Sequence, residues 1–295
     1  MENVTNKVAV SPSRPLIGCA ALSILHGDAN EQLRLLPSES VNCVVTSPPY
    51  FNQRDYGASG QIGTEATFDE YKQNLVAVFR QVFRVLRADG TLWLNLGDKY
   101  KNKNLLLVPA QIALALQADG WILRQDIIWN KPDCMPEPVR NRPTKSHEYL
   151  FLITKTSNYF FDAEAIKEPK QCWRPRGTKT RIKHDASRAD KVTLLEYGNK
   201  DFESGTRNKR SVWTIPTNNN MASTHFAVFP EKLVEPCVLA GCPTGGVVLD
   251  PFAGSGTTGA VALKHGRSAI LIELNKDYVE IIKQRCSNLQ QKLIA

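Results

Sequence analysis

Two short segments of the chain carry residues whose types and spacing are suited to chemistry. The first, Thr46-Ser-Pro-Pro-Tyr50, directly follows the β-branched run at residues 41–45. The two prolines end that strand, fix the backbone and contribute no N–H groups, so neighbouring carbonyls stay free as acceptors. Together with the hydroxyl of Ser47, such carbonyls can accept hydrogen bonds from an amino group. The ring of Tyr50 offers a flat surface on which a base can stack.

The second segment is a turn with two glycines, Asp250-Pro-Phe-Ala-Gly-Ser-Gly-Thr257, between a predicted strand at 246–250 and a predicted helix at 257–265. Ligands of open α/β sheets bind at the carboxyl ends of the strands, close to helix N-termini. Gly254 and Gly256 would let the backbone approach such a ligand closely. No Lys follows the glycines, as one does in triphosphate-binding loops, and the spacing is not Gly-x-Gly-x-x-Gly.

Acidic residues at two strand ends define this ligand further. Asp250 would repel a phosphate and attract a cationic ligand. Glu273 ends the next predicted strand, residues 268–273, where an acid can accept both hydroxyls of a ribose. An adenosyl ligand that carries a sulfonium and an ammonium group fits this pattern better than a dinucleotide does. The alternative is a glycine turn that lies near an unrelated surface Glu.

These segments need a scaffold that brings strand ends together. The hydrophobic pattern predicts strands at residues 22–26, 41–45, 91–96, 121–129, 147–154, 246–250 and 268–273, and helices at 29–36, 68–86, 105–117, 230–240, 257–265 and 277–293. This alternation predicts an α/β fold, with a doubly wound, mostly parallel seven-stranded sheet and helices on both faces.

The positive charge of the 295-residue chain is concentrated in one segment. The net charge is +8, and residues 167–210 hold 13 Lys and Arg against 6 Asp and Glu, with only 10 hydrophobic residues. Such a segment cannot build much core of its own. Concentrated positive charge indicates a polyanionic partner. A solvated loop without a partner is the alternative.

Composition also excludes several classes of protein. Hydrophobic residues make up 42% of the chain, which excludes wholesale disorder, and no stretch approaches the roughly 18 apolar residues that span a bilayer. The polar N-terminus lacks the apolar core of a secretion signal, so we expect a cytoplasmic protein of a prokaryote or phage. The seven cysteines are scattered without a Cys-x-x-Cys pair, so we expect neither a disulfide framework nor a metal site.

With both segments in view, the chain resembles the DNA amino-methyltransferases that use S-adenosylmethionine, in their permuted β group. In that group the Pro-Pro-Tyr motif comes first, the target-recognition region second and the glycine-rich cofactor motif last. This chain has the same order from about residue 22 to 289. The form Thr-Ser-Pro-Pro-Tyr, with Ser47 at the first motif position, resembles the N4-cytosine subgroup, since adenine-N6 members usually carry Asp or Asn there.

The resemblance implies a Rossmann-like methyltransferase fold and roles for individual residues. The first catalytic part would span residues 16–162, the target-recognition region 163–220 and the second, cofactor-binding part 221–295. The cofactor S-adenosylmethionine would be bound by Asp28, Phe229, Pro230, Asp250, Pro251, Phe252, Gly254, Gly256, Thr257 and Glu273.

Double-stranded DNA is the implied partner. Two basic clusters would bind it, one of Arg174, Arg176, Lys179, Arg181 and Lys183 and one of Arg207, Lys209 and Arg210. No membrane partner is expected, and the protein would be a monomer or a homodimer. A cognate restriction endonuclease would accompany it without forming a stable complex.

The implied reaction methylates the exocyclic N4 amine of a cytosine that is flipped out of duplex DNA. The candidate catalytic residues are Ser47, Pro48, Pro49, Tyr50 and Asp98. The amine would donate to the Ser47 hydroxyl and the Pro48 carbonyl. Asp98 would take a proton directly or through Ser47, or would instead bind cofactor or cap a helix. Adenine-N6 methylation, methylation of a protein or RNA amine, and DNA binding without catalysis stay open as alternatives.

Three further sites have both a chemical and a structural interpretation. Cys237 follows a proline, as the nucleophile of cytosine-C5 enzymes does, but it lies inside a predicted helix, so we expect it to be buried. We expect His147 to be structural, at the start of a strand. Residues 129–132, Trp-Asn-Lys-Pro, could shape a base pocket or belong to the aromatic core.

Substituting Gln for all five residues of the first basic cluster, at positions 174, 176, 179, 181 and 183, should weaken DNA binding and its salt dependence. Each lost phosphate contact lowers the slope of log K against log salt by about 0.9. Fluorescence anisotropy of a labelled duplex over a series of salt concentrations measures this slope. Calorimetric titration with cofactor should give an unchanged affinity, and a loss of cofactor binding would contradict the assignment of the cluster to DNA.

Overall fold

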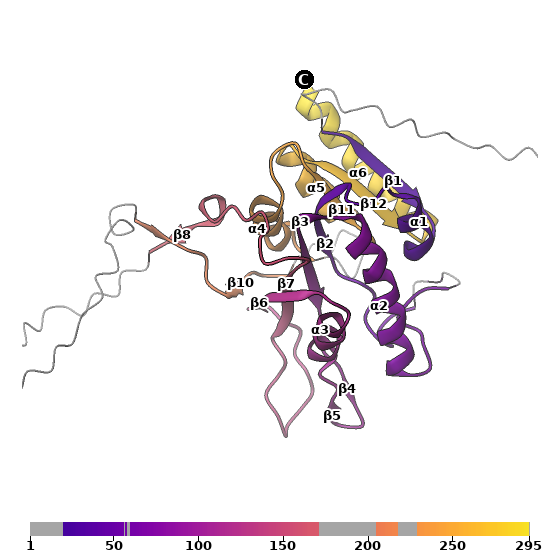
Figure 1. The fold of residues 1–295 in the computed structure, drawn as a ribbon. Helices are drawn as coiled ribbons and strands as arrows, with labels where there is room; N and C mark the ends of the chain where they lie inside the picture. Colours follow the sequence, from indigo (N-terminus) through magenta and orange to yellow (C-terminus); the bar gives the residue numbers. More distant parts are fainter. Residues whose placement is uncertain (1–19, 56, 58–59, 171–204, 218–228, 295) are drawn as a thin grey trace, which may run out of the picture.

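The computed structural model describes residues 20–55, 57, 60–170, 205–217 and 229–294, and it confirms the predicted α/β class (Figure 1). The main sheet has the strand order β1-β12-β11-β2-β3-β7-β6-β10. Neighbouring strands run parallel except at β7, which is antiparallel to both β3 and β6. In chain order these strands are β1 (Leu22–His26), β2 (Val41–Thr46), β3 (Leu86–Leu96), β6 (Ile122–Asn130), β7 (His147–Thr154), β10 (Val212–Thr214), β11 (Val247–Asp250) and β12 (Ser268–Glu273).

Helices cover both faces of this sheet. They are α1 (Ala29–Leu35), α2 (Phe68–Val85), α3 (Val108–Ala118), α4 (Glu231–Gly241), α5 (Thr257–Lys264) and α6 (Lys276–Ile294). Successive residues of a strand point to opposite faces. In β2, Val44 packs with residues of α1, α2 and α3, whereas Cys43 and Val45 pack with residues of α4 and α5. Burial on both faces explains why the central strands are almost continuously apolar.

Two elements begin more than two residues away from their predicted starts. β3 begins at Leu86, directly after α2, although the strand was predicted to begin at residue 91; the register shift between Val41 and Cys43 accommodates the extra residues of β3. α3 begins at Val108 rather than at residue 105, because β4 (Tyr100–Lys101) and β5 (Asn104–Leu105) form a hairpin and Leu107 has a φ of +54°. Among the described residues, no helix is both long and apolar enough to cross a membrane.

Part of the predicted recognition region belongs to the scaffold. β10 pairs in parallel with β6, which makes the main sheet one strand wider than the seven strands that were predicted. Trp213 of β10 is buried, and its ring centroid lies 6.4 Å from that of Trp93. Before β10, η1 (Glu164–Ile166) leads to a ladder of β8 (Glu168–Pro169) and β9 (Thr206–Arg207). The first basic cluster lies outside the described residues.

A buried carboxylate joins the central strands at their carboxyl ends. Asp250, the last residue of β11, is fully buried and accepts hydrogen bonds from Thr46 Oγ1 at 2.6 Å and Thr258 Oγ1 at 2.7 Å. It also accepts one from the backbone N–H of Phe252 at 3.0 Å. Because Thr46 ends β2 and Thr258 lies in the first turn of α5, this side chain holds three elements together.

Burial raises the pKa of Asp250 from 3.8 to about 6, against the opposing effect of its hydrogen bonds. The folded protein therefore binds the carboxyl proton of Asp250 more tightly than the unfolded chain does. This proton binding adds to the free energy of unfolding below about pH 4, and the contribution is lost as the pH rises to about 6. That loss corresponds to roughly 3 kcal/mol.

Asp250→Asn should lack this pH-dependent loss. Its amide N–H can donate to Thr258 Oγ1, whose hydroxyl can still donate to the carbonyl of Val45 at 3.2 Å. Urea unfolding of both proteins at about pH 4 and about pH 7 measures the effect. The free energy of unfolding of the variant should improve relative to wild type as the pH rises, and an equal difference at both pH values would contradict the prediction.

Candidate active site

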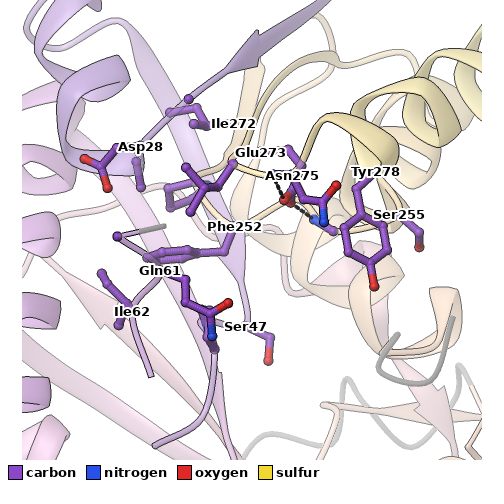
Figure 2. A pocket seen from close by; sticks show the side chains of 17 residues that line it. Asp28, Ser47, Gln61, Ile62, Phe252, Ser255, Ile272, Glu273, Asn275 and Tyr278 are labelled. Carbon is purple, nitrogen blue, oxygen red and sulfur yellow. Dashed lines mark hydrogen bonds between the residues drawn. The ribbon is translucent and has the colours of Figure 1, made fainter. Parts of the chain in front are cut away.

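A cavity opens at the carboxyl ends of β1, β12, β11 and β2 (Figure 2). Candidate residues from both sequence segments line it: Asp28, Ser47, Pro49, Pro251, Phe252, Gly254 and Glu273. Other lining residues were not predicted from the sequence, namely Gln61, Ile62, Ser255, Ile272, Asn275 and Tyr278. Asn275 and Tyr278 follow a predicted strand end and could have been found by that position, whereas Gln61 and Ile62 lie in a loop without a pattern.

The carboxylate of Glu273 accepts hydrogen bonds from two backbone N–H groups. Oε2 accepts from the N–H of Gly254 and Oε1 from the N–H of Asn275, each at 2.8 Å (Figure 2). Burial raises the pKa of Glu273, and these hydrogen bonds oppose the rise. The side chain is therefore fixed at the cavity wall, at the position from which an acid accepts ribose hydroxyls.

The end of β1 is tied to the end of β12. Gly27, with a φ of +142°, donates its N–H to the carbonyl of Glu273 at 2.9 Å. Asp28 follows as the N-cap of α1 and accepts from the N–H of Glu31 at 3.0 Å. This cap holds the carboxylate of Asp28 at the same end of the sheet as Glu273, and both residues line the cavity.

The two glycines of the turn have different tasks. Gly254 has a φ of +52°, and a Cβ added there would meet no atom within 4 Å, so its backbone is open to a ligand. Gly256, with a φ of +79°, begins α5, and a Cβ there would lie 3.1 Å from Ile282 of α6. Gly254 therefore lines the cavity, whereas Gly256 permits close packing behind it.

The remaining candidates for cofactor binding lie away from the cavity lining. The carboxylate of Asp250 is turned into the core between β2 and α5, as described above. Thr257 is buried and accepts from Arg285 at 3.1 Å. Pro230 is the buried N-cap of α4, and Phe229 packs against the core that α4 and α5 share. Residues 218–228, which precede Phe229, are outside the described part of the chain.

The Pro-Pro-Tyr loop keeps one carbonyl available next to Ser47. The hydroxyl of Tyr71 donates to the carbonyl of Pro49 at 2.9 Å. No group among the described residues donates to the carbonyl of Pro48. The side chain of Ser47 lines the cavity, whereas Pro48 is buried and is not among the lining residues.

Tyr50 is anchored by both its ring and its hydroxyl. Its ring lies so close to Gly97 that a Cβ there would approach Cε2 to 2.6 Å. Its hydroxyl accepts from Ser47 Oγ at 3.3 Å and donates to Glu148 Oε2 at 2.8 Å. Further partners of these groups complete a cluster that we call the Tyr50 network: Ser47, Tyr50, Asn95, Glu148 and Lys131.

Glu148 and Lys131 were not singled out from the sequence. Glu148 lies at the start of β7, and Lys131 directly follows the neighbouring strand β6. The two form an ion pair in which both side chains are mostly buried. Lys131 also lies over the ring of Trp129, 4.1 Å from its centroid. Glu148 could have been found because it is a charged residue near the start of a largely apolar predicted strand, residues 147–154.

Asp98 caps a helix, which was one of the three roles that the sequence suggested. Its Oδ1 accepts from the N–H of Lys99 at 2.8 Å and from the N–H of Val108, the first residue of α3, at 3.0 Å. α3 has no cap from its own N-cap residue, Leu107, so Asp98 satisfies one of its free N–H groups. The side chain is 9% exposed.

The second basic cluster is partly used within the protein. Arg207 and Arg210 both pair with Glu168, at 2.9 and 3.0 Å, and Lys209 lies 4.8 Å from the ring centroid of Trp213. Cys237 is buried in α4, as expected. No group of metal-ligating side chains occurs among the residues that the structure covers.

Comparison with known proteins agrees with this geometry. The model of the DNA methylase family matches residues 41–284. The type II methyltransferase M.SmaI of Serratia marcescens is 44% identical over 291 residues, which cover 89% of this chain and 89% of that protein. The cytosine-N4-specific PvuII DNA methyltransferase has the same fold, with a TM-score of 0.68 at 19% identity over 94% of this chain and 93% of that one.

A protein of Thermus thermophilus in complex with S-adenosyl-L-methionine has a TM-score of 0.62 and 29% identity, over 92% of this chain and 96% of that one. The family match spans both chemical segments and every strand of the main sheet except β1. The chain therefore belongs to the S-adenosylmethionine-dependent DNA amino-methyltransferases.

Proposed function

We propose that the protein transfers a methyl group from S-adenosylmethionine to the exocyclic N4 amine of a flipped cytosine in duplex DNA. The observation that carries this proposal is the position of Ser47. It lines the same cavity as Glu273 and Gly254, and its hydroxyl is held by Tyr50. A neutral hydroxyl at this place, instead of a carboxylate or carboxamide, supports cytosine as the target base.

The cavity suits S-adenosylmethionine by the chemistry of its walls. Glu273 and Asp28 supply carboxylates for the ribose and for the positive charges of the cofactor, and Gly254 leaves space where a side chain would stand. Ile62, Phe252 and other apolar side chains can enclose an adenine ring. When bound, the cofactor supplies an electrophilic methyl group on a positively charged sulfur.

The residues of the Pro-Pro-Tyr loop would prepare the amine. The Ser47 hydroxyl donates its hydrogen bond to Tyr50. Both lone pairs of Ser47 Oγ are therefore left to accept from an N–H of the amine. The Pro48 carbonyl accepts the second N–H. Two acceptors together favour a tetrahedral nitrogen, whose lone pair is no longer delocalised into the ring. The rate gain comes from positioning and electrostatics, without a covalent intermediate.

The relatives support a role in modification of DNA at specific sites. M.SmaI is described as a type II methyltransferase, and we propose that this protein likewise acts beside a restriction endonuclease. Residues 163–220 would contact the DNA, with the described Lys209 and Arg210 at their C-terminal end. Methylation of adenine N6 on the same scaffold is the competing proposal, because the matching family model covers both N6 and N4 enzymes.

Identification of the methylated nucleoside tests the target base. DNA from a host that expresses the protein, and lacks other methyltransferases, is digested to nucleosides and analysed by mass spectrometry. We expect N4-methylcytosine, because the neutral hydroxyl of Ser47 lines the cavity and is hydrogen-bonded to Tyr50. N6-methyladenine as the sole product would overturn the cytosine proposal.

Ser47→Ala should lower kcat by about 10²–10³-fold, since loss of one positioned hydrogen-bonding group in an active site typically has this effect. Its affinity for S-adenosylmethionine should change little. Ser157→Ala, at an exposed position just after β7, is the matched control and should keep wild-type rates. A Ser47→Ala protein with an unchanged kcat would remove Ser47 from the mechanism.

A further inference from the structure

The hydrogen bonds of the Tyr50 network lead away from Ser47 in one direction. A tyrosine hydroxyl has one proton to donate and can accept with its lone pairs. Tyr50 accepts from Ser47 Oγ at 3.3 Å and from Asn95 Nδ2 at 2.8 Å. Its own proton therefore goes to Glu148 Oε2, at 2.8 Å. The result is a continuous path from the cavity-lining hydroxyl to a carboxylate.

Asn95 fixes the direction of this path. Its Nδ2 donates to Tyr50 Oη and to Glu148 Oε2, each at 2.8 Å. If the amide were turned round, its oxygen would face a carboxylate oxygen, and two acceptors would repel each other. The Oδ1 of Asn95 is buried and has no hydrogen-bond partner among the described residues. An unsatisfied buried acceptor lowers the stability of the fold, and the two hydrogen bonds of Nδ2 offset this loss.

Glu148 is paired with Lys131. Lys131 Nζ donates to Glu148 Oε1, and the two side chains are only 17% and 16% exposed. Within the described part of the chain, the titratable side chains that contact Glu148 are Lys131 and Tyr50. His147, the preceding residue of β7, has its ring against Tyr149 instead. Oε2 of Glu148 therefore faces the phenol, whereas Oε1 faces Lys131.

Tyr50 can pass a proton on but does not keep a charge. Burial, followed by the neighbouring carboxylate of Glu148, raises the pKa of Tyr50 well above its usual range. The phenol must therefore give up its proton to Glu148 as it receives one from Ser47. The 3.3 Å between Ser47 and Tyr50 is long for an O–H···O bond, and such bonds often tighten when substrate binds.

Asp98, the acceptor suggested by the sequence, is not on this path. Its Oδ1 is occupied by the N–H groups of Lys99 and Val108. In the described ranges, no hydrogen bond joins its side chain to Ser47 or Tyr50.

Resting on the proposed function, we propose that Glu148 is the final acceptor of the proton that the target amine loses, reached through Ser47 and Tyr50. As nitrogen bonds to the methyl group, the carbon–sulfur bond breaks and its electron pair stays on sulfur. Nitrogen gives a proton to Ser47 Oγ, Ser47 gives its own to Tyr50 Oη, and Tyr50 gives its own to Glu148. The sulfur loses its positive charge and Glu148 its negative charge, so the step balances.

Glu148→Gln separates proton acceptance from shape, because Gln can still accept from Tyr50 but cannot take its proton. Single-turnover methyl transfer from tritiated S-adenosylmethionine to DNA of a methylation-free host is measured across pH. The wild-type rate should fall at acid pH, because the path needs an unprotonated acceptor at its end. The variant should be at least about 100-fold slower near neutral pH and should lack this fall. A purely structural role would not remove the pH dependence.

Glu280→Gln is the matched control, since it removes a carboxylate that pairs with a lysine, Lys283, on the exposed face of α6. It should keep the wild-type rate and pH profile. Affinity for S-adenosylmethionine, measured by calorimetry, should be the same within about twofold in all variants. If Glu148→Gln fails to fold, Tyr50→Phe supplies the same test, because it interrupts the path but leaves the ion pair of Glu148 intact.

The combined variant tests whether Tyr50 and Glu148 act as one path. Tyr50→Phe with Glu148→Gln should be no more than about threefold slower than the slower single variant, because a path needs to be interrupted only once. Additive losses, or a Glu148→Gln protein with the wild-type rate and pH profile, would overturn the path. N6-methyladenine as product would overturn only the cytosine proposal, because the same rates still report on transfer to an exocyclic amine.

Discussion

The geometry of the site depends on the hydrogen bonds of one buried carboxylate. Asp250 joins the last residue of β2, through Thr46, to the first turn of α5, through Thr258. Ser47 follows Thr46, and the glycine turn follows Asp250, so the same bonds hold both chemical segments side by side. A carboxylate removed from water is tolerated only when it is hydrogen-bonded, so this contact favours one arrangement of the strands over all others.

β2 lies in the middle of the sheet and divides the site into two halves (Figure 1). On one side, β11, β12 and β1 end at the cavity that Gly254 and Glu273 line. On the other side, β7 and β6 carry Glu148 and position Lys131. Ser47 belongs to both halves, since it lines the cavity and donates into the Tyr50 network. In the proposed reaction, the methyl donor therefore binds on one side of Ser47 and the proton leaves on the other side.

The strand ends that carry the site could be predicted because their signals are local. Prolines 48 and 49 and glycines 254 and 256 interrupt apolar runs, and the order of strands and helices follows from periodicity. The Tyr50 network could not be predicted in this way, since Tyr50 and Glu148 are 98 residues apart and meet only through the pairing of β2, β3 and β7. β10 has only three residues in a polar segment, too few for a pattern, and is recognised as a strand only by its pairing with β6. The inward orientation of Asp250 likewise depends on contacts from β2 and α5.

The most direct measurement is a crystal structure of the protein with duplex DNA and a non-reactive analogue of S-adenosylmethionine. The account predicts a cytosine flipped out of the helix, with its N4 amine within hydrogen-bond distance of Ser47 Oγ and the Pro48 carbonyl. It also predicts that the ribose hydroxyls of the analogue lie on the carboxylate of Glu273. An amine that contacts neither acceptor, or an analogue bound away from Glu273, would contradict the account.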